Sequence, residues 1–388
     1  MSTAYETDWT GRFRGRARSV ERPTSTDEVA ALLARCSRDG VPVTIAGGRT
    51  GLVGGAVPPE DGSALVLSTE RLTTLDVDAD AGVVHAGAGV TIADVQASAR
   101  TAGWEYAVDL ASRDSATVGG TIATDAGGVH VVGYGATGAQ VVAVTAVRMD
   151  GTVDEQADVA ALVGSEGALA VITSAMLRLH RPPAAIAVGV VPVTDVADAL
   201  RVLAVVRTLP GLRAVEYAEA PVVDTTHVLV EIAGEVDELA PLDPAMAADE
   251  AVGRTRLWSQ REGAAERVAR ESAERDETVH KLDVAVPLER LVAFRAALVD
   301  VVPADELRLW GHLAEGHLHV NVWGPYDDAV LELVVAHDGD VSSEHGVGRA
   351  KVAAFAATRP DEAAAMRARK DAYDPQWLLN PGVVVTRH

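Results

Sequence analysis

The stretch AGGRTGLVGGAVP, residues 46–58, follows an apolar run and holds five glycines within nine positions. Glycines reach positive φ angles and let backbone N–H groups approach an anion without obstruction by a Cβ atom. A dinucleotide-binding Rossmann motif would open a helix after its last glycine, but Val57-Pro58-Pro59 prevents a helix here. The stretch therefore predicts a diphosphate-binding loop and argues against the ordinary NAD fold, although such a loop taken alone is equally consistent with a plain tight turn.

Two further glycine-rich stretches follow. TVGGTIATDAGG, residues 117–128, is preceded by SRDS at 112–115 and followed by Tyr134-Gly135, and its small residues leave room for a flat ligand. GSEG, residues 164–167, predicts a third turn. Three small-residue loops from one lobe can line a single elongated site, which makes three plain turns the weaker interpretation.

Length, charge and cysteine content limit the class of protein. The 388 residues exceed one ordinary domain and predict two lobes, or one lobe with an insertion. A formal charge of −22 repels phosphate backbones and anionic lipid, so we expect neither nucleic acid nor a membrane as partner. The sequence has no apolar run of a spanning helix and no signal-peptide pattern, which predicts no transmembrane segment and a cytoplasmic location. Cys36, the only cysteine, lies on a predicted apolar helix face and is expected in the core.

Hydrophobic periodicity and turn residues outline the first part of the chain. Short strands alternate with helices up to Arg181-Pro182-Pro183, which marks a domain boundary. The helices expected here lie at 25–40 and 91–102, and the hairpins turn at 78–82 and 150–151.

Strand and helix patterns then continue to about residue 340. The expected helices lie at 196–209, 266–277 and 288–301, and the expected strands at 185–193, 227–234, 282–287 and 318–324. Residues 235–254, which are acidic and rich in Ala and Pro, predict a loop. Repeated units of this kind indicate an α+β sheet layer with helices on one face.

Five of the eleven histidines lie between residues 312 and 345. Apolar residues alternate in HLHVNV, residues 317–322, so His317, His319 and Asn321 share one face of a strand. His312, on the expected loop before this strand, can fold back toward that face. A carboxylate from the SEHG turn at 343–346 would complete two imidazoles into a three-ligand site with open positions for substrate. Metal binding is therefore favoured for the cluster, whereas any one histidine taken alone would more often be a surface or core residue.

These motifs together resemble the flavin-binding lobe of the vanillyl-alcohol-oxidase superfamily. GGRTGLVGGAVP, ATVGGTIATDAGG with its later YG, and GSEGALAVIT carry the resemblance. The chain is most similar to the branch of glycolate oxidase catalytic subunits, D-lactate dehydrogenases and D-2-hydroxyglutarate dehydrogenases. The resemblance implies an α+β fold with a two-part FAD-binding lobe at 1–182 and an α+β substrate (cap) domain with an antiparallel sheet at 183–340. Residues 341–388 would be a C-terminal segment that completes the flavin and substrate site.

The resemblance implies FAD as cofactor, with its diphosphate along the first glycine stretch and its isoalloxazine near the second. The residues expected to contact FAD are Gly47, Gly48, Arg49, Thr50, Gly51, Gly54, Gly55, Ser112, Ser115, Thr117, Gly119, Gly120, Thr124, Gly127, Gly128, Gly135, Glu166, Gly167, Ile172 and Asn380.

The resemblance also assigns roles in the histidine cluster. GH at 311–312 through HVN at 319–321 is similar to the family's metal-binding strand, which implies His312 and His319 as ligands of a divalent ion, zinc before manganese. SSEHGVG at 342–348, followed by Lys351, matches the pattern that supplies a third ligand, Glu344, and a general base, His345.

The substrate-carboxylate region of the family resembles LW at 257–258 with Arg261, and KLDVAVP at 281–287. Arg261 and Lys281 are therefore expected to bind the acid, with His317 and Asn321 close to it. For Arg261, an ion pair on a helix surface with Glu262 or Glu266 is an equal alternative.

The chain departs from the family pattern at three places. Ala314-Glu315-Gly316-His317 stands where Gly-Asp-Gly-Asn is usual, so His317 replaces an asparagine expected near flavin and substrate. Asp125 replaces an asparagine in the second flavin loop, and Val383 stands where a lysine is common. These departures bear on the substrate more than on the fold.

The activity that the resemblance implies is FAD-dependent oxidation of a small anionic D-2-hydroxy acid to the 2-oxo acid. A metal would contact the hydroxyl and carboxylate, His345 would take the hydroxyl proton, since an unperturbed imidazole with a pKa of about 6.5 suits neutral pH, and flavin N5 would take the hydride. Electrons would pass on to a quinone, a carrier protein, a dye or oxygen.

Two alternatives remain open at this point. One is a superfamily member with different chemistry, such as a sugar-alcohol oxidase or an ether-lipid synthase. The other is a flavin-carrying subunit whose own site has decayed. The sequence also leaves the assembly open, with a homodimer among the options.

Overall fold

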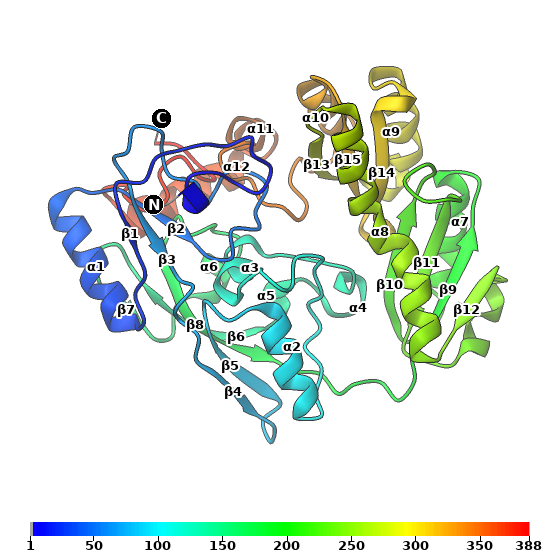
Figure 1. Cartoon of the computed structure of the whole chain (residues 1–388), viewed down its shortest axis with the longest axis horizontal. Coiled ribbons are helices and arrows are strands. Elements are labelled where there is room, and N and C mark those ends of the chain that lie inside the picture. The colour runs from blue at the N-terminus through cyan, green and yellow to red at the C-terminus, as the bar shows by residue number, and fades with distance from the viewer. Residues whose placement is uncertain (1–2, 388) are drawn as a thin grey trace. The chain divides into compact units, whose positions relative to one another are not determined.

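A computed structural model describes residues 3–387 and divides the chain into two compact units (Figure 1). Unit 1 comprises the residues up to Gly127, then 135–182, and those from Glu344 onward. Unit 2 comprises Gly128–Tyr134 and Pro183–Ser343.

Unit 1 contains two sheets. The strands β1 (Val20–Glu21), β3 (Leu65–Ser68) and β2 (Val43–Ala46) pair in parallel, in that order. The second sheet is antiparallel, with the order β4 (Leu75–Asp78), β5 (Val83–Gly87), β8 (Val171–Arg178), β6 (Val141–Val147) and β7 (Val153–Asp154). The pairs β4–β5 and β6–β7 confirm both hairpins expected from the turn residues.

The helix α1 (Thr26–Asp39) begins and ends as its sequence indicates. The Ser25 hydroxyl accepts the backbone N–H of Glu28, and Gly40 closes the helix at φ 64°. Cys36 is buried on the apolar face, as expected, and burial raises the pKa of its thiol. The remaining helices of unit 1 are α2 (Ile92–Thr101), α3 (Val118–Thr124), α5 (Thr137–Gln140), α6 (Val159–Leu162), α11 (Val352–Thr358) and α12 (Pro360–Tyr373).

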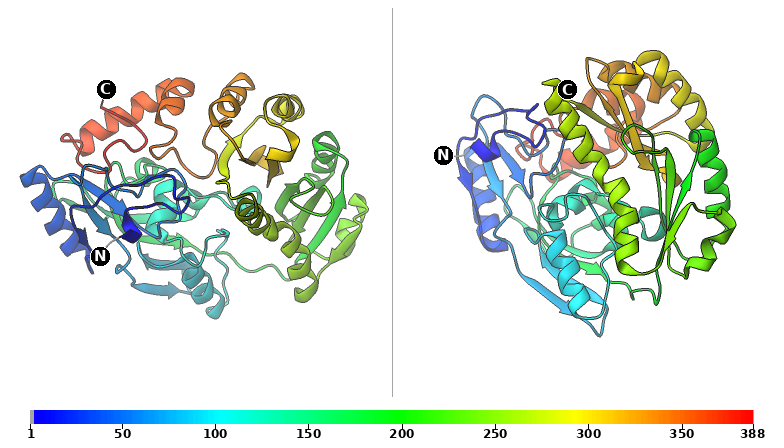
Figure 2. Two further views of the ribbon diagram at one scale, coloured as in Figure 1. Left: turned by 45° about the horizontal axis from the view of Figure 1, so that its top comes forward. Right: turned by 45° about the vertical axis from the view of Figure 1, so that its right-hand side comes forward.

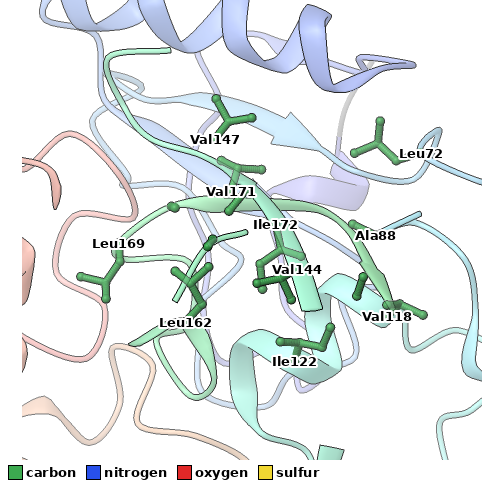
Figure 3. Close-up of a cluster of buried hydrophobic side chains, with 14 of the residues drawn as sticks. Leu72, Ala88, Val118, Ile122, Val144, Val147, Leu162, Leu169, Val171 and Ile172 are labelled. Carbon is green, nitrogen blue, oxygen red and sulfur yellow. The ribbon is translucent and has the colours of Figure 1, made fainter. Parts of the chain in front are cut away.

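The core of unit 1 lies between its antiparallel sheet and the short helices (Figure 3). Ile122 of α3 lies close to Val144 of β6 and Ile172 of β8 in this cluster. Part of the second glycine-rich stretch is thus helical rather than a loop, because Val118 and Ile122 are both buried on one side of α3. Asp125 ends the helix in the left-handed region, at φ 48°, which aspartate tolerates better than most residues.

Unit 2 is built on one seven-stranded sheet in which every neighbouring pair is antiparallel. The strand order is β12 (Met246–Ala248), β9 (Ala187–Pro192), β11 (His227–Ile232), β10 (Leu212–Ala218), β14 (Leu307–His312), β15 (His317–Val322) and β13 (His280–Ala285). This is the antiparallel sheet expected for the substrate domain.

Helices cover both faces of this sheet, so the expectation of helices on one face is wrong. The long helix α8 (Ala251–Arg275) crosses one face (Figure 2), where its Ala264 packs with Ala218 and Trp310. On the other side, α7 (Val196–Val206) contacts β10 and β11, and α9 (Leu288–Val301) packs against α7 and α10 (Asp327–Ala336). The short α4 (Val131–Tyr134) contacts β10.

Three local expectations in unit 2 are wrong. The helix expected at 266–277 begins fifteen residues earlier, at Ala251, because its buried face consists of only Leu257, Ala264 and Val268 among charged residues. The loop expected at 235–254 contains a 3-10 turn (Val236–Leu242), β12 and the start of α8. His312, expected on a loop, is the last residue of β14. Across residues 3–387, every helix is too short or too polar to cross a bilayer.

Candidate functional site

The first and second glycine-rich stretches contact each other closely in unit 1. The backbone N–H of Gly48 donates to the Thr117 hydroxyl at 3.2 Å. A Cβ atom added to Gly48 would lie 1.9 Å from the carbonyl oxygen of Ser115, so only glycine allows this approach. The structure therefore brings together the two stretches that the sequence assigns to one ligand.

The third glycine turn is joined to the segment that carries the SEHG motif. The buried carboxylate of Glu166 accepts the backbone N–H of Val347 at 2.6 Å and that of Gly348 at 2.9 Å. A Cβ atom on Gly346 would lie 2.7 Å from this carboxylate. Glu166, expected to contact FAD, thus holds the C-terminal segment in place, a role that the sequence did not indicate.

The C-terminal LNPG motif also makes contacts within unit 1. The Asn380 side chain accepts the backbone N–H of Ile45 at 2.7 Å and donates to the Glu166 carbonyl at 2.7 Å. Lys370 is buried, and its ammonium donates to Asp374, to the Ala168 carbonyl and to the Leu379 carbonyl. Asn380 was expected to contact FAD. Its side-chain amide forms two hydrogen bonds within the protein, which fix the end of β2 and the third glycine turn.

Other residues expected to contact FAD are placed as follows. The Arg49 guanidinium lies 4.3 Å from the ring centroid of Tyr5 and donates to the Ala4 carbonyl at 3.3 Å, so it faces the N-terminal segment. Ile172 is buried in the core of unit 1. Ser112 accepts, through its carbonyl, the backbone N–H of Ser115, and the Thr124 hydroxyl donates to Gly120. Gly135 follows α4, and the remaining residues lie along the same three stretches: Gly47, Thr50, Gly51, Gly54, Gly55, Gly119, Gly127, Gly128 and Gly167.

Glu166 should make the stability of the protein depend on pH near neutrality. Burial raises its pKa from 4.5 to about 7, although the N–H groups of Val347 and Gly348 and the Lys351 ammonium act to lower it. The folded state therefore binds this proton more tightly than the unfolded state. Its stabilising contribution is complete below the unfolded pKa and is lost as the pH rises through the folded value.

We expect the free energy of unfolding of the apoprotein to fall by up to about 1.4 kcal/mol per pH unit between about pH 5 and 7. Urea unfolding at each pH measures this slope. Glu166→Gln should flatten it, whereas Glu155→Gln, at an exposed position, should leave it unchanged. An identical slope in the wild type and in Glu166→Gln would contradict the assignment.

His312, His317 and His319 gather on the sheet face that α8 covers. Residues opposite each other on neighbouring strands point to the same face, and the register places Glu216 opposite His312, Trp310 opposite His319 and His319 opposite Asp283. The ring centroids of His312 and His317 lie 4.9 Å apart, and those of His317 and His319 lie 4.6 Å apart. One ring nitrogen from each of the three histidines lies within 4.8 Å of the others.

Two buried carboxylates contact ring nitrogens of His312 and His317 and so orient these imidazoles. Glu216 contacts Nδ1 of His312 and accepts from Nε of Arg261 at 2.7 Å. Burial alone would raise the pKa of Glu216, but His312 and Arg261 together hold it below its usual value. Asp283, which is fully buried, contacts Nε2 of His317. Neither carboxylate was predicted as a functional residue, since a single acid in an alternating strand looks like a solvent-facing residue.

The residues expected to bind the substrate carboxylate lie on the same face. Arg261 forms an ion pair with the buried Glu216 of β10, at 2.7 Å, so its side chain lies toward the sheet. Lys281 lies opposite Asn321 in the strand register, and burial lowers the pKa of its ammonium. The Asn321 amide donates to the His319 carbonyl at 3.2 Å.

The chain leaves unit 2 beside this face. Asp340 forms two backbone hydrogen bonds with Ala285, at 3.0 and 2.7 Å, and Ala285 lies opposite His317. The Asp340 carboxylate also accepts the backbone N–H of Ser342 at 2.9 Å. Glu344 and His345 follow directly after Ser343, the last residue of unit 2.

A second buried network explains why Gly128–Tyr134 belongs to unit 2. The Glu231 carboxylate contacts His130 at 3.1 Å, Nε of Arg213 at 2.7 Å and the indole N–H of Trp258 at 2.8 Å. Burial would raise the pKa of Glu231, but hydrogen bonds and charges from His130 and Arg213 lower it to about 2. His130, two residues after the second glycine-rich stretch, is therefore held by a buried carboxylate of β11.

Comparisons with known proteins agree with this architecture. A family model described as an FAD binding domain matches residues 17–155, and one described as the C-terminal domain of FAD linked oxidases matches residues 210–384. A D-2-hydroxyglutarate dehydrogenase of Xanthomonas citri pv. viticola is 32% identical over 99% of this chain and 92% of its own length. A D-lactate dehydrogenase of Archaeoglobus fulgidus is 31% identical over 95% of this chain and 91% of its own length.

Among solved structures, an alkyldihydroxyacetonephosphate synthase superposes with a TM-score of 0.72 over 93% of this chain and 75% of that chain, at 15% identity. This likeness shows a shared fold. The family matches confirm FAD as the cofactor that the glycine-rich stretches indicated. The chain belongs to the FAD-linked oxidases of the vanillyl-alcohol-oxidase superfamily, in the branch that contains D-2-hydroxyglutarate and D-lactate dehydrogenases.

Proposed function

We propose that this protein oxidises a D-2-hydroxy acid to the 2-oxo acid, with FAD as hydride acceptor and a divalent metal ion that holds the acid. The observation that carries the proposal is the set of three imidazoles on one sheet face, backed by Glu216 and Asp283. A protein that only carried flavin would have no use for oriented histidines of this kind.

The residues of unit 1 fit FAD. Gly47 and Gly48 pack so closely on the second stretch that side chains are excluded there, and a loop rich in glycine suits the approach of an anion to the backbone. The side chain of Arg349 holds buried nitrogens for which residues 3–387 supply no acceptor, as expected beside an anionic cofactor. FAD, when bound, supplies N5 as acceptor for the hydrogen and electron pair of the substrate carbon.

The residues of unit 2 fit a divalent ion. Imidazole nitrogens and a carboxylate are ligands typical of zinc and also suit manganese. We propose His312, His319 and Glu344 as the ligands, with Glu216 fixing the ring of His312 in the way carboxylates support metal-bound histidines. Glu344 lies four residues beyond Asp340 and hence within about 14 Å of it, which allows it to reach the histidines. A bound ion lowers the pKa of a coordinated hydroxyl group.

Different residues of this chain would bind the acid and accept its proton. His345 accepts the hydroxyl proton. Lys281 offers a desolvated ammonium to the carboxylate, and Arg261 offers the terminal nitrogens that its pairing with Glu216 does not use. His317 and Asn321 lie on the same face and contact the acid. We propose a quinone or a carrier protein as electron acceptor, because a chain with one cysteine cannot ligate an iron–sulfur cluster through thiolates.

Glu216 offers a test of the metal site that does not depend on turnover. We expect Glu216→Gln to weaken binding of Zn²⁺ or Mn²⁺ by about 10- to 100-fold, because His312 loses the charged partner that orients it. Titration of the metal-free protein with each ion measures the affinity. Glu219→Gln is the matched control, since Glu219 pairs with Arg295. An equal loss in both variants would argue against an orienting role for Glu216.

The activity itself is tested by anaerobic reduction of the purified protein. We expect D-lactate, D-2-hydroxyglutarate or glycolate to bleach the visible absorbance of the oxidised flavin. L-lactate should leave this absorbance unchanged. A yellow protein with bound metal that no hydroxy acid bleaches would overturn the proposal and favour a flavin-carrying role.

A further inference from the structure

Arg349 is half-buried, and two of its side-chain nitrogens are enclosed without an acceptor among residues 3–387. These nitrogens are Nε and Nη2, and both are inaccessible to solvent. Burial lowers the pKa of this guanidinium. The guanidinium of arginine keeps its proton near neutral pH, so the positive charge remains. Enclosed donors of a charged group are costly unless an acceptor pairs with them, and a ligand can supply that acceptor.

Neighbouring cations in unit 1 are already engaged. Lys370 pairs with Asp374 at 2.6 Å. Arg49, the one arginine of the first glycine stretch, stacks on Tyr5. Lys351 lies near the Glu166 carboxylate and lowers its pKa. Among these cations of the described residues, Arg349 is the one with buried side-chain nitrogens that find no acceptor.

The backbone of Arg349 is fixed on the first glycine stretch. The N–H groups of Arg349 and Ala350 both donate to the Val53 carbonyl, at 2.9 and 3.2 Å. A Cβ atom on Gly348 would lie 2.2 Å from the same oxygen, so the two segments touch through their backbones. The side chain of Arg349 therefore starts beside the loop whose glycines suit a diphosphate.

We propose that Arg349 binds the diphosphate of FAD from the C-terminal segment, as the charged partner of the backbone N–H groups in residues 46–58. The inference rests on FAD binding, and it extends the proposed function by coupling the cofactor to the reactive segment. Arg349 lies four residues after His345. Binding of FAD would therefore hold the segment that carries Glu344 and His345 in its working position.

The test uses full-length protein and three flavins. Riboflavin lacks phosphate, FMN carries one, and FAD carries the diphosphate, so a phosphate contact affects them differently. We expect Arg349→Met to weaken FAD binding to the apoprotein by about 10- to 100-fold, the usual worth of a hydrogen bond to a charged group. Riboflavin affinity should be unchanged, and Arg349→Lys should recover part of the loss. Quenching of flavin fluorescence measures all three affinities.

The melting temperature of the apoprotein separates a ligand contact from a structural one. Because Arg349→Met removes two enclosed nitrogens that lack an acceptor, we expect the apoprotein to melt at the same or a higher temperature. Arg359→Gln, a surface change in the same unit at an arginine paired with Glu362, should alter neither affinity nor melting. Hydrogen exchange of residues 342–352 should slow on FAD binding in the wild type and much less in Arg349→Met.

Two results would overturn the proposal. Equal losses for riboflavin and FAD would place the contact on the isoalloxazine ring instead. A lower melting temperature of the apoprotein with unchanged FAD affinity would make Arg349 a structural residue. Neither measurement involves a hydroxy acid, so a protein that binds FAD through Arg349 yet is not bleached would refute the proposed oxidation and leave this inference standing.

Discussion

Replacing His345 by alanine leaves the yellow flavin bound and slows its reduction by the hydroxy acid by about 10²- to 10⁴-fold. The size of the effect follows from the role proposed for this side chain, because a positioned base contributes this much to removing a proton in the transition state. FAD should remain bound, because the residues proposed to bind it are those of the glycine-rich stretches and Arg349, and His345 is not among them. The substrate dissociation constant should change far less than the reduction rate.

Stopped-flow absorbance under anaerobic conditions measures the rate, and the flavin spectrum before mixing measures the occupancy. His337→Ala is the matched control, because His337 lies at the end of α10 and its Nδ1 contacts the Leu333 carbonyl. That variant should reduce at the wild-type rate. If His345→Ala were reduced as fast as the wild type, another group would have to take the proton.

Replacing His319 by alanine should empty the metal site and lower kcat/KM by at least about a hundredfold. The reason is that the proposed ion polarises the substrate hydroxyl and orients the acid. His319 lies opposite Trp310 and Asp283 at the centre of the histidine face. Chelation of the wild-type protein should have the same effect, and added Zn²⁺ or Mn²⁺ should reverse it.

Metal content by elemental analysis and turnover with an artificial acceptor together measure this prediction. We expect about one ion per chain in the wild type, as a three-ligand site requires, and a loss of that ion in His319→Ala. His85→Ala, at an exposed position on β5, should retain both metal and activity. Full activity in a protein stripped of metal would refute the assigned ligands.

Much of unit 1 could be predicted because its signals are local. Ser25 and Gly40 mark the ends of α1, and the turn residues of both hairpins act over a few positions of the chain. The strands β10 and β14 were missed because LRAVEYA and LRLWGH carry charged residues on a face that is buried rather than solvated. The polar residues on that face are part of the candidate site. The alternation of buried apolar and exposed polar residues, which usually indicates a strand, is therefore absent from these two segments.

The site was predictable where several residues of one kind gather. Repeated glycines and the histidine series each stand out against a chain of 388 residues. Glu216 and Asp283 did not stand out, and Glu166 was expected only as an FAD contact, because the partner of each acid lies far away in sequence. Their roles appear only when the fold brings Glu216 to His312, Asp283 to His317 and Glu166 to Val347.

The most direct measurement is a crystal structure of the FAD-bound protein with anomalous scattering data collected at the absorption edge of its metal. We expect one anomalous peak between the side chains of His312, His319 and Glu344, on the side of the flavin that presents N5. A peak held by other residues, or these three side chains directed away from the flavin, would contradict metal-assisted oxidation by this protein.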